Sequence, residues 1–330
     1  MNEKVYQTLK SAETEDWVDY HIIRPFSYLW VRFFAYLGIH PNTVTILSMI
    51  IGAGSCVFFA HGSYHYEGWS GLLFNLLAIL LLMIADVLDC VDGQLARLTG
   101  KKSRIGRILD GAAGFVWFIP IYSALVYRFY QHHDLEFGWL GLNGDSTTVW
   151  IATAIAFALA LLSGFMGISG QQRLADYYIQ VHLFFLKGEK GSELDNSARQ
   201  QEIYEQTNWE GRKAEKLFQQ SYVDYTRKQE QATPEFQRLL TVLRERYGSL
   251  DNLPEEVRRE IHAHSLALMP WNGLLTFNFR SAWLFLFCLL DVPVVFFLFE
   301  VIGMGLLTKY INHRHETFCR QIADKLKASR

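Results

Sequence analysis

The sequence predicts an all-α integral membrane protein with six transmembrane helices, an N-terminal amphipathic interfacial helix and a helical cytoplasmic insert. Of its 330 residues, 50% are hydrophobic and only 19% are charged. The charged residues leave six long apolar runs, and about 17–25 such residues span a bilayer as a helix. These runs cover residues 43–60, 71–85, 111–127, 146–170, 271–290 and 292–308. The second run reaches spanning length by continuing through Asp86 to Leu88. So many runs in one chain favour membrane spans over the core of a soluble protein.

Two polar segments complete this organisation. Residues 16–37 mix aromatic side chains with Arg24 and Arg32, as expected for a helix that lies in the headgroup region. Residues 171–270 are too charged for lipid and have helical charge patterning. We therefore expect five segments along the chain. These are a cytoplasmic N-terminus with the interfacial helix (1–42), four membrane helices (43–170), the insert (171–270), two membrane helices (271–311) and a cytoplasmic tail (312–330).

Lysine and arginine residues predict the orientation. The segments 1–42, 88–107 and 309–330 carry all but one of the Lys and Arg residues of the short non-membrane segments, and Arg128 is the exception. Positive residues stay in the cytoplasm, so both termini and the 88–107 loop are expected there, in an inner (cytoplasmic) membrane. A formal net charge of −2 gives no indication of a nucleic-acid partner. The four cysteines form no CxxC pair that would indicate a structural zinc site.

A group of acids marks the end of the second span. Asp89 and Asp92 lie one turn apart on one helix face, and Gly106 and Asp110 do so on the next helix. A short loop between the helices can bring the three carboxylates together. Oxygen ligands without histidine or cysteine favour Mg²⁺ or Mn²⁺, and the neighbouring basic loop would suit a pyrophosphate. The alternative is a solvated helix end that is simply acidic.

The same residues carry a resemblance. Asp89-x2-Asp92-Gly93-x2-Ala96-Arg97-x8-Gly106-x3-Asp110 resembles the signature of the CDP-alcohol phosphotransferase (CDP-alcohol phosphatidyltransferase) family. His40-Pro41-Asn42-Thr43 is similar to the family's Pro-Asn motif. The 171–270 insert lies outside the common family core.

The resemblance implies a phospholipid-biosynthesis transferase that requires two divalent cations, Mg²⁺ or Mn²⁺. A substituted phosphate would move from CDP-diacylglycerol or a CDP-amino-alcohol to an acceptor hydroxyl on a lipid or polyol, with release of CMP. By position, Asp89, Asp92 and Asp110 would be the metal ligands and catalytic residues. The resemblance also implies homodimers among membrane lipids. The CDP moiety would be bound by Asp89, Gly93, Ala96, Arg97, Gly106 and Asn42.

The sequence departs from the family at Gly114, where the pattern has a fourth aspartate that serves as metal ligand and base. Three explanations stay open. Asp86, one turn before Asp89, could substitute; the acceptor could supply its own base; or the chain could be catalytically impaired. The last case leaves an alternative function, a membrane protein that binds CDP-lipid without turnover. A transporter ranks below both, because it would need polar residues spread at mid-depth through several spans.

The acceptor site is less clearly indicated. Arg280 with Asn278 could hold a phosphate or carboxylate of the acceptor. Extension of Arg280 to the interface, as long basic side chains commonly do, is the alternative. Glu300 is the one strongly intramembrane acid and could pair with a neighbouring helix or line the cavity.

Overall fold

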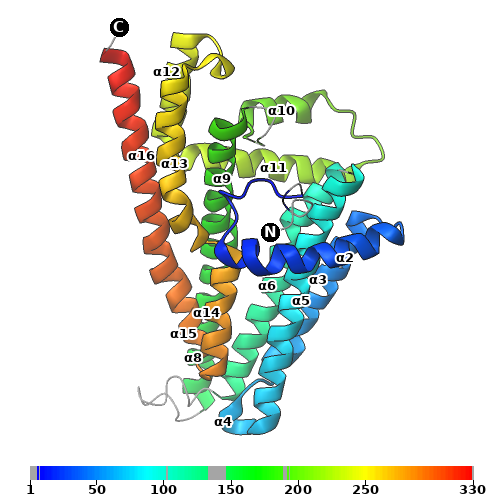
Figure 1. Ribbon diagram of the computed structural model, residues 1–330. Coiled ribbons are helices and arrows are strands. Elements are labelled where there is room, and N and C mark those ends of the chain that lie inside the picture. Colours follow the sequence, from blue (N-terminus) through cyan, green and yellow to red (C-terminus); the bar gives the residue numbers. More distant parts are fainter. Residues whose placement is uncertain are drawn as a thin grey trace. The chain divides into compact units, whose positions relative to one another are not determined.

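The computed structural model describes residues 6, 8–101, 103–132, 146–188, 192 and 194–328. Every element in these ranges is helical, which confirms the all-α prediction for the described residues. Figure 1 shows the ribbon. The helices are η1 (Asp19–Ile23), α2 (Arg24–Tyr36), α3 (Pro41–Ala60), α4 (Tyr64–Glu67), α5 (Trp69–Thr99), α6 (Arg104–Gln131), α8 (Ser146–Met166), η3 (Gly167–Gln171), α9 (Gln172–Lys187), α10 (Ser197–Gln206), α11 (Lys213–Ala232), α12 (Pro234–Tyr247), η5 (Leu250–Asn252), α13 (Glu255–Gly273), α14 (Phe277–Leu289), α15 (Pro293–Leu298), η6 (Phe299–Met304) and α16 (Gly305–Ala328).

The chain forms two compact units. The first, which we call the membrane unit, comprises Met1–Ser169 and Phe277–Met304. The second, the helical unit, comprises Gly170–Thr276 and Gly305–Arg330. The helical unit thus contains the expected insert together with the C-terminal helix, a combination that hydropathy does not reveal.

Long apolar helices build the membrane unit. Five described helices are long and apolar enough to cross a membrane: Pro41–Ala60, Trp69–Thr99, Leu109–Gln131, Ser146–Lys187 and Pro293–Ala328. Helices α3, α5 and α6 pack side by side around a core that includes Leu82, Trp117 and Phe118. Their length and apolar composition support an integral membrane protein.

The expected fifth span does not reach spanning length. The apolar run at 271–290 is divided, because α13 continues to Gly273 and α14 begins only at Phe277. The 13 residues of α14 cover about 20 Å at 1.5 Å per residue, less than the hydrocarbon core of about 30 Å. Among the described helices, length and composition therefore support five spans rather than six.

The N-terminal helix α2 crosses α5 and lies far from the short helix α4 (Figure 1). Val31 on α2 is fully buried against Val91 and Leu95 of α5. The other faces of α2 expose large apolar side chains, among them Leu29 and Phe33. The position in the headgroup region stays a prediction, but an exposed apolar surface on such a helix is what that position requires.

The helical unit has its own apolar core. Phe236, Leu239 and Leu243 of α12 pack with Phe185 of α9 and Ile322 of α16. Helix α13 packs on α9 and on α16 within the same unit. The helical reading of the insert therefore holds for its described residues.

Candidate functional site

The motif acids lie in the last turns of α5. This helix runs on to Thr99 and ends at Gly100, whose φ of 68° is the left-handed conformation that favours glycine at a helix end. Asp92 is buried, with 6% of its surface exposed, and Asp89 is half-buried. The acids are therefore held on regular helix rather than on a loop.

Helix α6 brings Asp110 to the same end of the membrane unit. Ser103 caps the helix, because the Gly106 N–H donates to its Oγ at 2.9 Å. A Cβ at Gly106 would stand 2.9 Å from Asn42 Oδ1, so any larger residue here would require the Asn42 side chain to shift. Asn42 sits at the start of α3, where its N–H donates to His40 Nδ1. The predicted CDP-binding residues Asn42 and Gly106 are thus neighbours.

The three motif aspartates form one electrostatic group. Asp110 is the charged residue that acts most strongly on both Asp89 and Asp92. Their oxygens do not all lie within 4.8 Å of one another: among the described residues of either unit taken alone, His315, Glu316 and Cys319 form the group that does.

Two buried oxygens in this group suit a cation. Asp89 Oδ1 and Asp92 Oδ2 are buried and have no hydrogen-bond partner among the described residues. An unpartnered buried carboxylate oxygen costs free energy that a bound cation recovers. The oxygen-only donor set therefore fits the divalent cation that the motif implies.

The guanidinium of Arg97 lies directly beside Gly93 on α5. A Cβ at Gly93 would stand 3.4 Å from both Nη atoms of Arg97. The Arg97 Nε donates to the carbonyl oxygen of Thr8, so the N-terminal segment orients this guanidinium. Ala96 is half-buried on the same helix. Sequence reasoning missed the role of Thr8, because it is a backbone contact that no side-chain pattern shows.

Asp86 lies one turn before Asp89 on α5, and its charge acts on the Asp89 carboxylate. Asp86 is also close to charged groups of the N-terminal segment, and those that act on it most strongly are Asp19, Arg24 and Asp16. That segment is fixed by an ion pair of 3.0 Å between Arg24 Nε and Glu15 Oε2. Asp86 as the substitute for the acid missing at position 114 therefore stays a prediction, and Gly114 itself is half-buried on α6.

Arg280 does not reach the interface, contrary to the snorkelling alternative. Its side chain is fully buried and forms an ion pair with Glu300, which is also fully buried. Asn278 is engaged elsewhere, donating to Asp16 Oδ2 at 2.9 Å. The structure thus leaves Arg280 and Asn278 with protein partners and without a free acceptor-binding surface.

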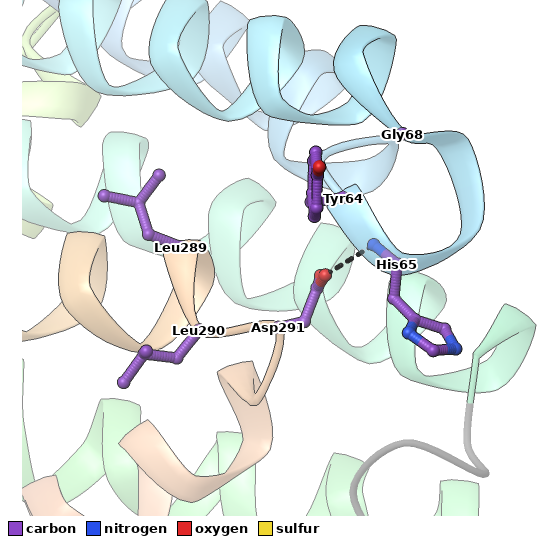
Figure 2. A pocket seen from close by; sticks show the side chains of 6 residues that line it. All are labelled: Tyr64, His65, Gly68, Leu289, Leu290 and Asp291. Atoms are coloured by element: carbon purple, nitrogen blue, oxygen red, sulfur yellow. Dashed lines mark hydrogen bonds between the residues drawn. The ribbon is translucent and has the colours of Figure 1, made fainter.

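A pocket opens at the opposite end of α5 from the acids. Figure 2 shows its lining by Tyr64, His65, Gly68, Leu289, Leu290 and Asp291. The Asp291 Oδ2 accepts from the His65 N–H at 2.9 Å, and its Oδ1 forms an ion pair with the buried Arg128. Because the polar groups of this pocket bond to one another, we interpret it as a structural contact among α4, α6 and α14.

Comparison with known proteins agrees with the motif. The family model described as CDP-alcohol phosphatidyltransferase matches residues 38–181, a little under half of the chain. Archaetidylinositol phosphate synthase of Pyrococcus horikoshii is 36% identical over 76 residues, which is 23% of this chain and 35% of that protein. The chain therefore aligns with about a third of that relative's length. For residues 38–181, the family match confirms the resemblance that the motif indicated.

Proposed function

We propose that the chain is a metal-dependent phospholipid-biosynthesis transferase of the CDP-alcohol phosphatidyltransferase family. It moves a substituted phosphate from a CDP-linked donor, CDP-diacylglycerol or a CDP-amino-alcohol, to an acceptor hydroxyl and releases CMP. The observation that carries this proposal is the group of Asp89, Asp92 and Asp110, with its two buried and unpartnered oxygens on α5.

Each motif residue has a task in this proposal. Asp89, Asp92 and Asp110 hold two divalent ions, Mg²⁺ or Mn²⁺. When bound, the ions neutralise charge on the pyrophosphate. Gly93 and Ala96 leave room for the cytidine beside α5, and Asn42 and Gly106 close the pocket from α3 and α6. Arg97 turns its guanidinium from the Thr8 carbonyl towards the phosphates. Such a site works by positioning and charge stabilisation.

The orientation belongs to the same proposal. The site and both termini face the cytoplasm at the inner membrane, and the active protein is a homodimer among membrane lipids. The charge distribution of the short loops supports the orientation, and the family resemblance supports the dimer.

The proposal is tested by measuring CMP release from CDP-diacylglycerol and CDP-amino-alcohols with Mg²⁺ or Mn²⁺. The acceptor panel includes an inositol phosphate, because the relative of Pyrococcus horikoshii is an archaetidylinositol phosphate synthase. We expect Asp92→Asn to remove the activity, because it takes away one of the three negative charges that must hold the ions. The matched control is Asp224→Asn, on the exposed surface of the helical unit, which should keep it.

Gly114 supports a second candidate, a protein that binds CDP-lipid without turnover. Titration of the purified protein with CDP in the presence of Mn²⁺ separates the two. Binding that depends on Asp92, without CMP release for any acceptor, supports the second candidate. Absence of both binding and release rejects both.

A further inference from the structure

Helix α16 of the helical unit presents three potential metal ligands that the proposed transferase does not use. His315, Glu316 and Cys319 are all buried, and their ligand atoms lie within 4.8 Å of one another. They come from one turn of α16 where it packs on α12 and α13 (Figure 1). Buried imidazole, thiol and carboxylate groups rarely gather without a reason, since each is costly to bury alone.

The distances fit a shared ion. His315 Nε2 lies 3.6 Å from Cys319 Sγ. Two ligands on a tetrahedral zinc ion, with bonds of about 2.05 Å to nitrogen and about 2.3 Å to sulfur, are about 3.6 Å apart. Ligands four residues apart on a helix share a face, so this spacing needs no distortion of α16.

Glu316 gives the cluster a fixed carboxylate. Its Oε2 accepts from the Glu235 N–H at 2.6 Å and its Oε1 from the Phe236 N–H at 3.2 Å. These bonds cap the first turn of α12. An ionised carboxylate has about four acceptor positions, so two remain for an ion. One thiolate and one carboxylate would also balance the charge of a divalent cation in this buried place.

Aromatic rings enclose the cluster. His315 packs against Tyr178 and Phe236, with ring centroids 4.9 and 5.3 Å away. His264 of α13 stacks on Phe318 at 3.7 Å, and its buried Nε2 has no hydrogen-bond partner among the described residues.

We propose that His315, Glu316 and Cys319 bind one zinc ion on α16, beside the start of α12, and that this ion stabilises the helical unit. Nitrogen and sulfur ligands select zinc over Mg²⁺ or Mn²⁺, which the oxygen-only aspartate group favours. This zinc ion has no part in phosphate transfer, so the inference stands independently of the proposed function.

The test measures zinc in the 330-residue chain, purified in detergent and passed through metal-free buffer. We expect about one zinc per chain and, after exchange with Co²⁺, a near-ultraviolet thiolate-to-cobalt charge-transfer band. Cys319→Ser should lose the band and most of the zinc. Cys288→Ser changes another buried cysteine, in the membrane unit, and should keep both.

A second measurement guards against misfolding of the cysteine variant. Glu316→Gln keeps an acceptor for α12 but removes a charge, and we expect its zinc affinity to fall by about tenfold or more. Zinc should raise the Tm of the wild-type protein and leave that of Cys319→Ser unchanged. A wild-type protein that binds no zinc, or a cobalt band that survives Cys319→Ser, would overturn the proposal and leave an ordinary buried His–Cys contact.

Discussion

Arg280 and Glu300 form an ion pair in which neither side chain exposes any surface, deep in the membrane unit. Tyr122 donates to Glu300 Oε2 at 2.6 Å, and Ser163 donates to the same oxygen. Four segments, α6, α8, α14 and η6, therefore meet at one carboxylate. Charged groups at this depth persist only when they are paired.

Removal of one partner should be strongly destabilising. Glu300→Gln leaves the Arg280 guanidinium buried and uncompensated, which costs about 3–5 kcal/mol. We expect a large fall in Tm in detergent. Glu260→Gln breaks the exposed pair with Lys325 and should cost about 1 kcal/mol or less. Equal shifts for the two variants would contradict this role of the buried pair.

Two glycines on α3 should respond differently to the same change. A Cβ at Gly52 would stand 2.3 Å from Trp117 Cδ1, whereas one at Gly54 would meet no atom within 4 Å. Trp117 cannot move freely, because its Nε1 donates to the Ser48 carbonyl at 3.1 Å. Gly52→Ala should therefore destabilise by about 1–3 kcal/mol.

Gly54→Ala supplies the matched control, two residues away on the same helix. Alanine favours helix over glycine by about 1 kcal/mol, so this variant should be neutral or slightly stabilising. Thermal unfolding of both variants checks the pair, and a fall in Tm of similar size for each would show that α3 and α6 are not closely packed at Gly52.

The sequence predicts the helices of the membrane unit well where composition decides them. The run at 43–60 becomes Pro41–Ala60, and the run beginning at 71 belongs to Trp69–Thr99. That helix extends well past Leu88, because its acids lie on helix and only Gly100 ends it. The expected span at 271–290 was wrong in extent, since hydropathy cannot show that the chain turns between Gly273 and Phe277.

Contacts between distant segments could not be predicted. The spacing of Asp89, Asp92 and Asp110 indicated a shared site, because helix geometry fixes which residues share a face. No comparable rule links Arg280 to Glu300 or Thr8 to Arg97. These pairs depend on how helices pack, and a single hydropathy profile does not contain that information.

Asp19 predicts a pH dependence of stability. Burial and the neighbouring Asp16 raise its pKa to about 6, against partial relief from Arg24. The folded state thus binds this proton more tightly than the unfolded state, whose pKa is 3.8. The contribution of this bound proton to the free energy of unfolding is fully present below pH 3.8 and is lost as the pH rises through about 6.

A neutral side chain at position 19 should remove this dependence. We expect Asp19→Asn to raise Tm above pH 6 and to lose that advantage below it. The measurement is the difference in Tm between variant and wild type from about pH 5 to about pH 8. Asp224→Asn, at an exposed site, sets the background, and a constant difference for Asp19→Asn would contradict the prediction.

Restoring the fourth carboxylate tests the meaning of Gly114. Position 114 lies one turn beyond Asp110 on α6 and is half-buried, so an aspartate there shares the face of Asp110. A positioned base contributes about 10²–10⁴ in rate. We therefore expect Gly114→Asp to raise the rate of CMP release by about 10²-fold or more. Gly111→Asp adds the same charge at a position where a Cβ meets no atom within 4 Å, off the face of Asp110, and should give no gain. If Gly114→Asp leaves the rate unchanged or lowers it while CDP still binds, the base comes from the acceptor or from Asp86, and Gly114 belongs to a different mechanism.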